Sequence, residues 1–408
     1  MDVNSAYLSW SAVSILREHP GAVDLRTIPS AVGGDVEKRH GVILAKSIPA
    51  KRFGVTTGEP VAQALRKCPD LVLVSPDFRI YNAFSQRFIA ILNEYSPVVE
   101  QASIDEAYVD MTGTHLLYHD ALSVAYEIKD RIRRELGFTV NIGISDSKLL
   151  AKMASDFEKP DKVHTLYSDE IEEKMWPLPV GNMFGIGKAT AAQLQAMGMR
   201  TIGDVARQDK NLLISKFGVK SGTHLYDSVN GISHSEVTTE REDRKSYGNS
   251  VTLSEDVTKD NYKTMLNPIL LSLSDTVASR MRKDGAKGIT VTVQLRTSEF
   301  VNHSRQDTLA RPTDDADVIY GKAKELFKEL WNKNDRVRLI GVTVSNIQDD
   351  TFVQMNLFEE QTEHEMDEKN ENLLKVTDEI RKKFGKTSIT RGSLIKNNDT
   401  AGIGSKED

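Results

Sequence analysis

Two stretches in the first half of the chain repeat their apolar residues at the spacing of an amphipathic helix. They span residues 78–95 and 121–136. Three shorter runs, at 98–103, 107–112 and 139–144, have the length and apolar content of strands. This alternation predicts an α+β layer, with helices on one face of a mainly antiparallel sheet. The apolar positions of the first helix are Phe78, Tyr81, Phe84, Phe88, Ile91, Leu92 and Tyr95.

Residues 11–74 carry their own set of elements. Strands are expected near 26–32 and 41–46, and a helix is expected from Pro60, because proline favours the first turn of a helix. We therefore predict a small domain here, inserted into the α+β layer.

The pattern changes from Pro177 to about Gly231, where small residues and short helices dominate. Short helices at 188–197, 202–206 and 212–217 are the main elements predicted for residues 166–235. A run of charged and polar residues at 236–243 is typical of a linker.

A second α+β unit is predicted at 244–348. Its two alternating strands, 289–296 and 337–344, each follow a helix, at 261–283 and 315–331. Helices that precede strands in this way again favour a sheet covered on one face.

The last segment, 349–408, is acidic and is expected to be flexible. It holds 9 Lys/Arg against 14 Asp/Glu and so accounts for most of the net charge of −6. An amphipathic helix is predicted at 371–384, and 361–370 is expected to be disordered because it is polar and charged. A short apolar peptide, Gln-Met-Asn-Leu-Phe, stands at 354–358.

Composition narrows the class of protein. At 408 residues the chain is too long for one core, and its 39% hydrophobic and 27% charged residues are those of a soluble protein. We expect no membrane span and a cytoplasmic location, since no apolar run is long enough and Cys68 is the single cysteine. The charge of the whole chain neither supports nor excludes nucleic acid as a partner, because basic residues can still gather on one face.

Two adjacent acids, Asp105 and Glu106, interrupt a strand-like stretch that reads Ser-Ile-Asp-Glu-Ala-Tyr-Val-Asp at 103–110. A third acid, Asp2, lies about a hundred residues earlier. Acids disfavour strands, so a solvated hairpin tip is one explanation of the pair. The other is metal, since hard divalent cations bind carboxylates and phosphoryl transfer often uses two such ions.

The context of these acids decides between the two explanations. Asp2 and the 103–110 stretch are followed by Val-Asn-Ile-Gly-Ile-Ser at 140–145, and then by Lys-Leu-Leu-Ala-Lys-Met-Ala-Ser-Asp at 148–156 with Lys-Pro at 159–160. Together these motifs closely resemble the palm of the Y-family (translesion) DNA polymerases, near the bacterial polymerase IV group.

The resemblance covers almost the whole chain and implies a multidomain right-hand polymerase. It implies template-directed addition of deoxynucleotides to a primer 3′-OH, at low fidelity, during DNA repair or the damage response. The implied domains are a palm at 1–10 and 75–165, fingers at 11–74, a helical thumb at 166–235, a linker at 236–243, a little finger at 244–348 and a tail at 349–408.

In this family three carboxylates bind two Mg²⁺ ions, and here they correspond to Asp2, Asp105 and Glu106, with the main-chain carbonyl of Val3 as a further ligand. Tyr7 corresponds to the steric gate, the aromatic ring that clashes with a ribose 2′-OH. The ordinary structural interpretation of an isolated tyrosine is a core aromatic residue. The register of Tyr7 after Asp2 favours the gate.

For the incoming triphosphate the candidates are Lys51 and Lys159, with Ser47 and Arg52 weaker. The chain departs from the polymerase IV pattern here, because many relatives have Tyr and Arg at the positions of Ile48 and Lys51. Lysine keeps the charge but lacks the bidentate guanidinium fork. We therefore expect nucleotide binding to be weaker or differently arranged.

Contacts to primer-template DNA are expected in two domains. Phe-Gly-Ile-Gly-Lys at 184–188 resembles a helix-hairpin-helix, in which a tight turn and a helix N-terminus hold a backbone phosphate. The residues expected to bind DNA are Gly185, Gly187 and Lys188 in the thumb and Arg296, Ser304 and Arg305 in the little finger.

The apolar peptide at 354–358 resembles a motif that binds the sliding clamp (the β subunit), with Gln354, Leu357 and Phe358 as its anchors. Docking of this peptide back on its own domain is the alternative. We expect a monomeric enzyme. The alternative function is a catalytically weak, polymerase-like accessory protein that binds DNA and the clamp.

The position of Asp2 raises one further expectation. In the family the first metal-binding acid lies several apolar residues into the protein, at the end of a central strand. We therefore expect the natural product to begin upstream, and Asp2 to be held loosely here and the enzyme to be weakly active.

Overall fold

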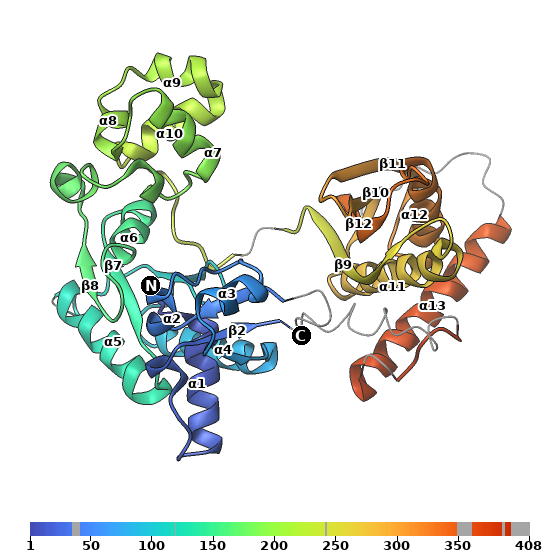
Figure 1. The fold of residues 1–408 in the computed structure, drawn as a ribbon, viewed down its shortest axis with the longest axis horizontal. Coiled ribbons are helices and arrows are strands. Elements are labelled where there is room, and N and C mark those ends of the chain that lie inside the picture. The colour runs from blue at the N-terminus through green and yellow to red at the C-terminus, as the bar shows by residue number, and fades with distance from the viewer. Residues whose placement is uncertain (35–40, 119, 241–242, 349–360, 386–387, 393–408) are drawn as a thin grey trace. The chain divides into compact units, whose positions relative to one another are not determined.

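A computed structural model describes residues 1–34, 41–118, 120–240, 243–348, 361–385 and 388–392. These residues form two compact units, the first made by residues up to 240 and the second by those from 243 onward (Figure 1). Each unit is described separately below. Within the described residues, no helix combines the length and the apolar character that a bilayer crossing requires.

The centre of the first unit is a three-stranded sheet with the order β1-β7-β8. β1 (Asp2–Val3) pairs antiparallel with β7 (Val140–Ile144), which pairs in parallel with β8 (Val163–Thr165). A two-stranded ladder of β5 (Val99–Gln101) and β6 (Ala107–Val109) lies beside it, joined by a bridge between Asp2 and Glu106. The three predicted strands correspond to β5, β6 and β7.

Two helices predicted from the sequence cover this sheet, α4 (Phe78–Asn93) and α5 (Ala121–Leu136). Asp77 and Asp120 cap their first turns, because each side chain accepts a hydrogen bond from a backbone amide there. The core beneath them includes the buried side chains Trp10, Tyr81, Phe88, Ile128, Ile132, Phe138 and Val140.

Helix α1 (Ala6–Glu18) was not predicted, and it crosses the proposed boundary between palm and fingers at residue 10. Its Trp10 and Val13 belong to the core under α4 and α5, whereas its Leu8 and Ala12 pack with residues of the neighbouring sheet. The same helix therefore contributes to two cores.

That neighbouring sheet has the order β3-β2-β4. Its strands are β2 (Ser30–Gly33), β3 (Ile43–Lys46) and β4 (Val72–Val74). The helices α2 (Ile48–Arg52) and α3 (Val61–Lys67) complete this part of the unit. Pro60 directly precedes α3, as the sequence predicts.

Helix α6 (Lys148–Ser155) follows β7, and four further helices make up the rest of the first unit. They are α7 (Lys188–Ala196), α8 (Ile202–Ala206), α9 (Lys210–Phe217) and α10 (Val219–Val229), of which α10 was not predicted. Their core is continuous with α6, which contributes Leu150, Met153 and Ala154. The described residues 232–240 contain no helix or strand.

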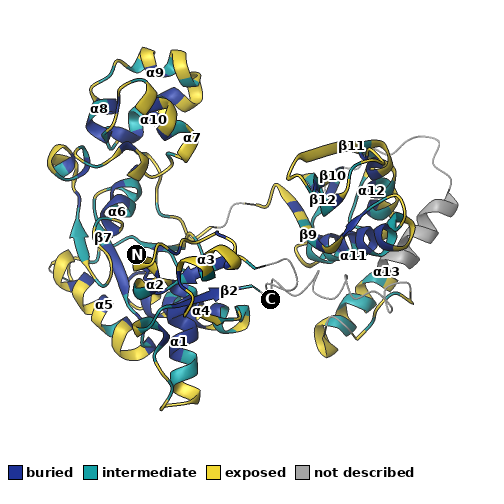
Figure 2. Ribbon diagram, viewed as in Figure 1, coloured by how far each residue is buried: buried dark blue, intermediate teal, exposed yellow. Residues whose placement is uncertain are grey.

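The second unit is an antiparallel sheet of order β11-β10-β12-β9, packed against two helices (Figure 2). The helices are α11 (Tyr262–Lys283) and α12 (Ala316–Leu330), close to the predicted bounds. The strands are β9 (Ser246–Val257), β10 (Lys287–Thr297), β11 (Asn302–Thr313) and β12 (Val337–Gln348). β11 is an edge strand, exposed along most of its length (Figure 2).

The last helix, α13 (Gln361–Phe384), begins ten residues before the predicted start, so the expectation of disorder at 361–370 is wrong. Its second half is joined to α11 by ion pairs of Asp378 with Arg282, at 2.6 Å, and of Arg381 with Asp275, at 2.9 Å. The peptide at 354–358 lies outside the described residues.

Candidate active site

Asp2 is fixed by backbone pairing on both sides of β1. It is in register with Asn141 of β7, and on its other side it forms a bridge with Glu106. The amide of Val3 donates to the carbonyl of Asp105 at 3.0 Å. The expectation of a loosely held Asp2 is therefore wrong: the ladder places Asp2 directly beside the adjacent acids.

The carboxylates of Asp2 and Glu106 meet at a lysine. Lys152 Nζ lies 2.9 Å from Asp2 Oδ2 and 2.8 Å from Glu106 Oε1, and Lys159 Nζ lies 2.7 Å from Asp2 Oδ1. Both lysines also contact Asp156, at 3.2 Å and 2.7 Å. Three acids and two ammonium groups thus form one connected charge network.

This network shifts the two carboxylates in opposite directions. Burial alone would raise the pKa of Asp2, but the bonds from Lys159 and Lys152 hold that pKa below its ordinary value. Burial raises the pKa of Glu106, and the neighbouring charge of Asp2 adds to that rise although Lys152 opposes it. Two such close acids repel each other, and the Lys152 ammonium group between them offsets that repulsion.

Asp105 is directed elsewhere than its neighbour Glu106. Its Oδ1 accepts a hydrogen bond from Ser103 Oγ at 2.8 Å, and its carboxylate lines a cleft that Asp2 also lines. Among the described residues, no three acidic, histidine or cysteine side chains already converge as a metal cage. The donor chemistry nevertheless fits a hard divalent cation, because carboxylates on neighbouring backbone segments are already gathered around positive charge.

The cleft has a volume of about 550 Å³ and brings together all but Glu106 and the weaker candidate Arg52 of the residues predicted to bind the metal, the sugar and the triphosphate. Its lining includes Asp2, Asp105, Tyr7, Lys46, Lys51 and Lys159. Glu106 does not line this cleft and reaches the site through Lys152 instead.

Tyr7 fits both interpretations of its ring. The ring stacks on Tyr81, with centroids 4.6 Å apart, and meets Phe78 edge-on at 6.0 Å. It also lines the cleft, and burial followed by the charge of Asp105 raises the pKa of its hydroxyl. The aromatic cluster therefore supports the ring from one side and leaves part of it facing the cleft.

Lys46 was missed by the sequence analysis. Its Nζ donates to Thr57 Oγ1 at 3.1 Å, and burial together with the charge of Lys51 lowers its pKa. Among the described residues, no carboxylate lies within ion-pair distance of Lys46 or Lys51. Alternation on β3 was a usable signal, because Lys46 follows the buried Ala45. Ser47, by contrast, caps α2 by accepting a hydrogen bond from Ala50 N at 3.1 Å.

Three family models match the chain. The impB/mucB/samB family matches residues 1–156, its C-terminal domain matches 244–357, and a DNA polymerase-iota thumb domain matches 181–233. A DNA polymerase IV of Clostridium acetobutylicum is 41% identical over 395 residues, which is 97% of both chains. A DNA polymerase IV 1 of Bacillus subtilis is 36% identical and covers 92% of this chain, with 89% of its own length matched.

The chain belongs to the Y-family DNA polymerases. The fold agrees with this assignment. A Y-family DNA polymerase chimera, Dbh-Dpo4(243-245)-Dbh, has a TM-score of 0.71, with 24% identity over 86% of this chain and 98% of its own. An insertion ternary complex of Dbh DNA polymerase has a TM-score of 0.58, with 22% identity over the same shares.

In this Y-family polymerase the predicted phosphate clamp lies at the start of α7. Gly185 has a φ of 85°, a backbone conformation that favours glycine, and a Cβ at Gly187 would meet no atom within 4 Å. Gly187 is the N-cap residue, and no side chain caps the first turn, which begins at Lys188. The open amides fit the predicted contact with a DNA phosphate.

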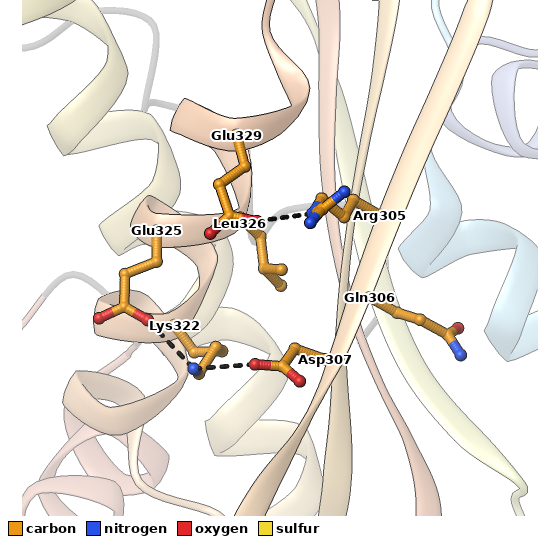
Figure 3. A pocket seen from close by; sticks show the side chains of 7 residues that line it. All are labelled: Arg305, Gln306, Asp307, Lys322, Glu325, Leu326 and Glu329. Carbon is orange, nitrogen blue, oxygen red and sulfur yellow. Dashed lines mark hydrogen bonds and ion pairs between the residues drawn. The ribbon is translucent and has the colours of Figure 1, made fainter.

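The polymerase holds Arg305 in an ion pair rather than as a free cation. Arg305 Nε lies 2.7 Å from Glu329 Oε2 of α12, across a small charged cleft of about 280 Å³ between β11 and that helix (Figure 3). Lys322 is paired with Asp307 in the same cleft, at 3.0 Å. The side chain of Arg296 is also engaged, because its Nε donates to Asn302 Oδ1 at 2.7 Å.

Proposed function

We propose that this Y-family chain is a template-directed DNA polymerase that adds deoxynucleotides to a primer 3′-OH, with low fidelity and across damaged bases. The observation that carries the proposal is the cleft in which Asp2 and Asp105 face Tyr7 and three lysines. A phosphoryl-transfer site requires acids for metal, cations for phosphate and a surface for the sugar. All three groups line this one cleft.

Two Mg²⁺ ions are proposed as the cofactor, held by Asp2, Asp105, Glu106 and the main-chain carbonyl of Val3. When bound, such ions increase the acidity of the primer 3′-OH and stabilise negative charge on the transferring phosphoryl group. The pairing of β1 with its neighbours keeps the backbone segments that carry the acids close together in the absence of substrate.

The nucleotide is expected to lie between the cations and the tyrosine. Lys51 and Lys159 bind the triphosphate, and Lys46 is added to them because it lines the same cleft and forms no salt bridge with a described carboxylate. Lys46 compensates for the guanidinium fork that Lys51 lacks. Tyr7 lies under the sugar and excludes a 2′-OH.

Primer-template DNA is expected on Gly185, Gly187 and Lys188 of one unit and on Arg296, Ser304 and Arg305 of the other. We propose a monomer that works in the cytoplasm, the compartment that holds the DNA of bacteria such as those of its relatives.

The sliding clamp is proposed as a partner through Gln354, Leu357 and Phe358. Replacing Leu357 and Phe358 by alanine should remove stimulation of extension by the clamp and leave clamp-free extension unchanged. Loss of clamp-free activity would instead indicate that the peptide has a structural role.

Primer extension with and without Mg²⁺ tests the catalytic proposal. Asp105→Ala and Glu106→Ala should each abolish extension while DNA binding, measured by fluorescence anisotropy, stays near wild type. Asp110→Ala is the matched control, because Asp110 belongs to the same stretch but its Oδ1 accepts a hydrogen bond from Thr112 N, at 2.8 Å, as in an ordinary turn. Near-normal extension by either site variant would show that the metal site is misassigned, whereas wild type without Mg²⁺-dependent extension would favour the catalytically weak accessory protein.

A further inference from the structure

Lys152 stands between two of the proposed metal ligands, yet the proposed chemistry gives it no task. Its Nζ is 2.9 Å from Asp2 and 2.8 Å from Glu106, and its side chain is only 11% exposed. The two acids come from different parts of the chain, 150 and 46 residues from the lysine. A single ammonium group therefore connects β1 to the acidic stretch between β5 and β6.

The backbone of α6 keeps this ammonium group in place. Ser147 caps the helix by accepting a hydrogen bond from Leu150 N at 3.3 Å. Leu150, Met153 and Ala154 are buried in the core that α6 shares with the helices after it. Because the helix is anchored on this face, Lys152 points to the acids from a fixed support.

An ordinary buried ion pair is the alternative explanation, and the chain contains one for comparison. Lys129 is similarly buried and contacts Asp130 at 3.0 Å and Asp161 at 3.1 Å, away from the cleft. Lys152 differs because both of its closest partners are proposed ligands of Mg²⁺. A divalent ion and this ammonium group would therefore compete for the same two carboxylates.

We propose that Lys152 is the resident counter-ion of the metal site: it holds Asp2 and Glu106 together while no metal is bound and weakens the binding of metal by competing for them. This inference rests on the proposed function. Asp156 gives the displaced ammonium group a place to go, since it already lies 3.2 Å from Lys152 and is not a proposed ligand. Lys152 is thus a positioning residue, not a catalytic one.

Calorimetric titration of the full-length, metal-stripped protein with Mg²⁺, without DNA or nucleotide, tests the proposal. Lys152→Met should bind Mg²⁺ about 10-fold more tightly than wild type, because the competing ammonium charge is removed; a tenfold change corresponds to about 1.4 kcal/mol. Lys152→Arg keeps the charge and should stay near wild type. Lys129→Met, the matched control, should lower the melting temperature without changing Mg²⁺ affinity.

A second measurement separates this role from a purely structural one. In EDTA, Lys152→Met should melt below wild type because the two acids repel each other, and Mg²⁺ should raise its melting temperature more than that of wild type. If Lys152→Met does not fold, Lys152→Gln allows the same comparison with a neutral hydrogen-bond donor. Magnesium affinity equal to or weaker than wild type in the folded neutral variant overturns the inference.

Failure of the proposed function has a different signature. Glu106→Gln should greatly weaken Mg²⁺ binding if Glu106 is a ligand. If wild type and Glu106→Gln bind Mg²⁺ equally, the metal site itself is misassigned. If Glu106→Gln loses affinity and Lys152→Met gains none, only the role of Lys152 is wrong.

Discussion

We expect the substitution Gly143→Ala, which adds one methyl group, to destabilise the structure around the site more than the same change at other glycines. Gly143 lies on β7, where that strand packs against α6. A Cβ at this position would fall 1.9 Å from the carbonyl oxygen of Ala151, 2.5 Å from the amide nitrogen of Ser155 and 2.9 Å from the Cβ of Ala154. Two of these atoms belong to the backbone, so rotation of a side chain cannot relieve the overlap.

The helix must therefore move away from the strand if Gly143 becomes alanine. Overpacking of a core costs up to about 3 kcal/mol in typical cases, and we take that upper end because a whole helix must shift. For a unit of this size the loss corresponds to a fall in melting temperature of about 6–12 °C. The shift would also disturb β7, the strand with which Asp2 of β1 is paired, so primer extension should fall as well.

Thermal unfolding followed by circular dichroism, together with primer extension below the transition, measures both effects. Gly181→Ala is the matched control, because its new Cβ would lie at an ordinary 3.7 Å from Ala191 and should leave stability nearly unchanged. A Gly143→Ala protein that melts within 1 °C of wild type and retains full activity would refute the reasoning.

Three further substitutions test the roles assigned to single side chains. Tyr7→Ala should admit ribonucleotides much more readily, because the ring under the sugar is lost; unchanged discrimination between rATP and dATP in a gel assay would assign Tyr7 to the aromatic cluster alone. Lys46→Met should raise the KM for deoxynucleotides about 10-fold, as expected for one charge-assisted hydrogen bond, while DNA affinity stays constant; an unchanged KM would remove Lys46 from the triphosphate site. Glu329→Gln should strengthen DNA binding several-fold at low salt, because it releases Arg305 from its solvent-exposed ion pair with Glu329. Unchanged affinity for DNA would show that Arg305 does not contact DNA.

The elements with one buried face could be predicted from the sequence. α4, α5, α11 and α12 each turn one apolar face to a single core, so their periodicity is regular and their predicted bounds are close. α1 escaped prediction because two different cores bury opposite sides of it. β11 escaped for the reverse reason, since most of its residues are exposed and no alternation remains.

The candidate site was predictable only in part. The sequence motifs that resemble the Y-family palm allowed Asp2, Asp105 and Lys159 to be named, and the structure brings these residues to one cleft. Lys152 could not be assigned a role, because its partners are set by the pairing of distant strands rather than by neighbours in the sequence. Arg305 was predicted to contact DNA, and its ion pair with Glu329 of α12 could not be foreseen without the packing of that helix beside β11.

Because α1 contributes to two hydrophobic cores, it limits how far the cleft can change shape when a nucleotide binds. Leu8 and Ala12 pack against the β3-β2-β4 sheet, which carries Lys46. Trp10 and Val13 pack in the core of the α+β layer that carries Asp2, Asp105 and Glu106. A hinge within this helix would have to break one core to move the other. The distance between the residues of β1 and those of β3 that line the cleft should therefore stay constant when a nucleotide binds. Correct and damaged base pairs would then be held in a cleft of the same dimensions.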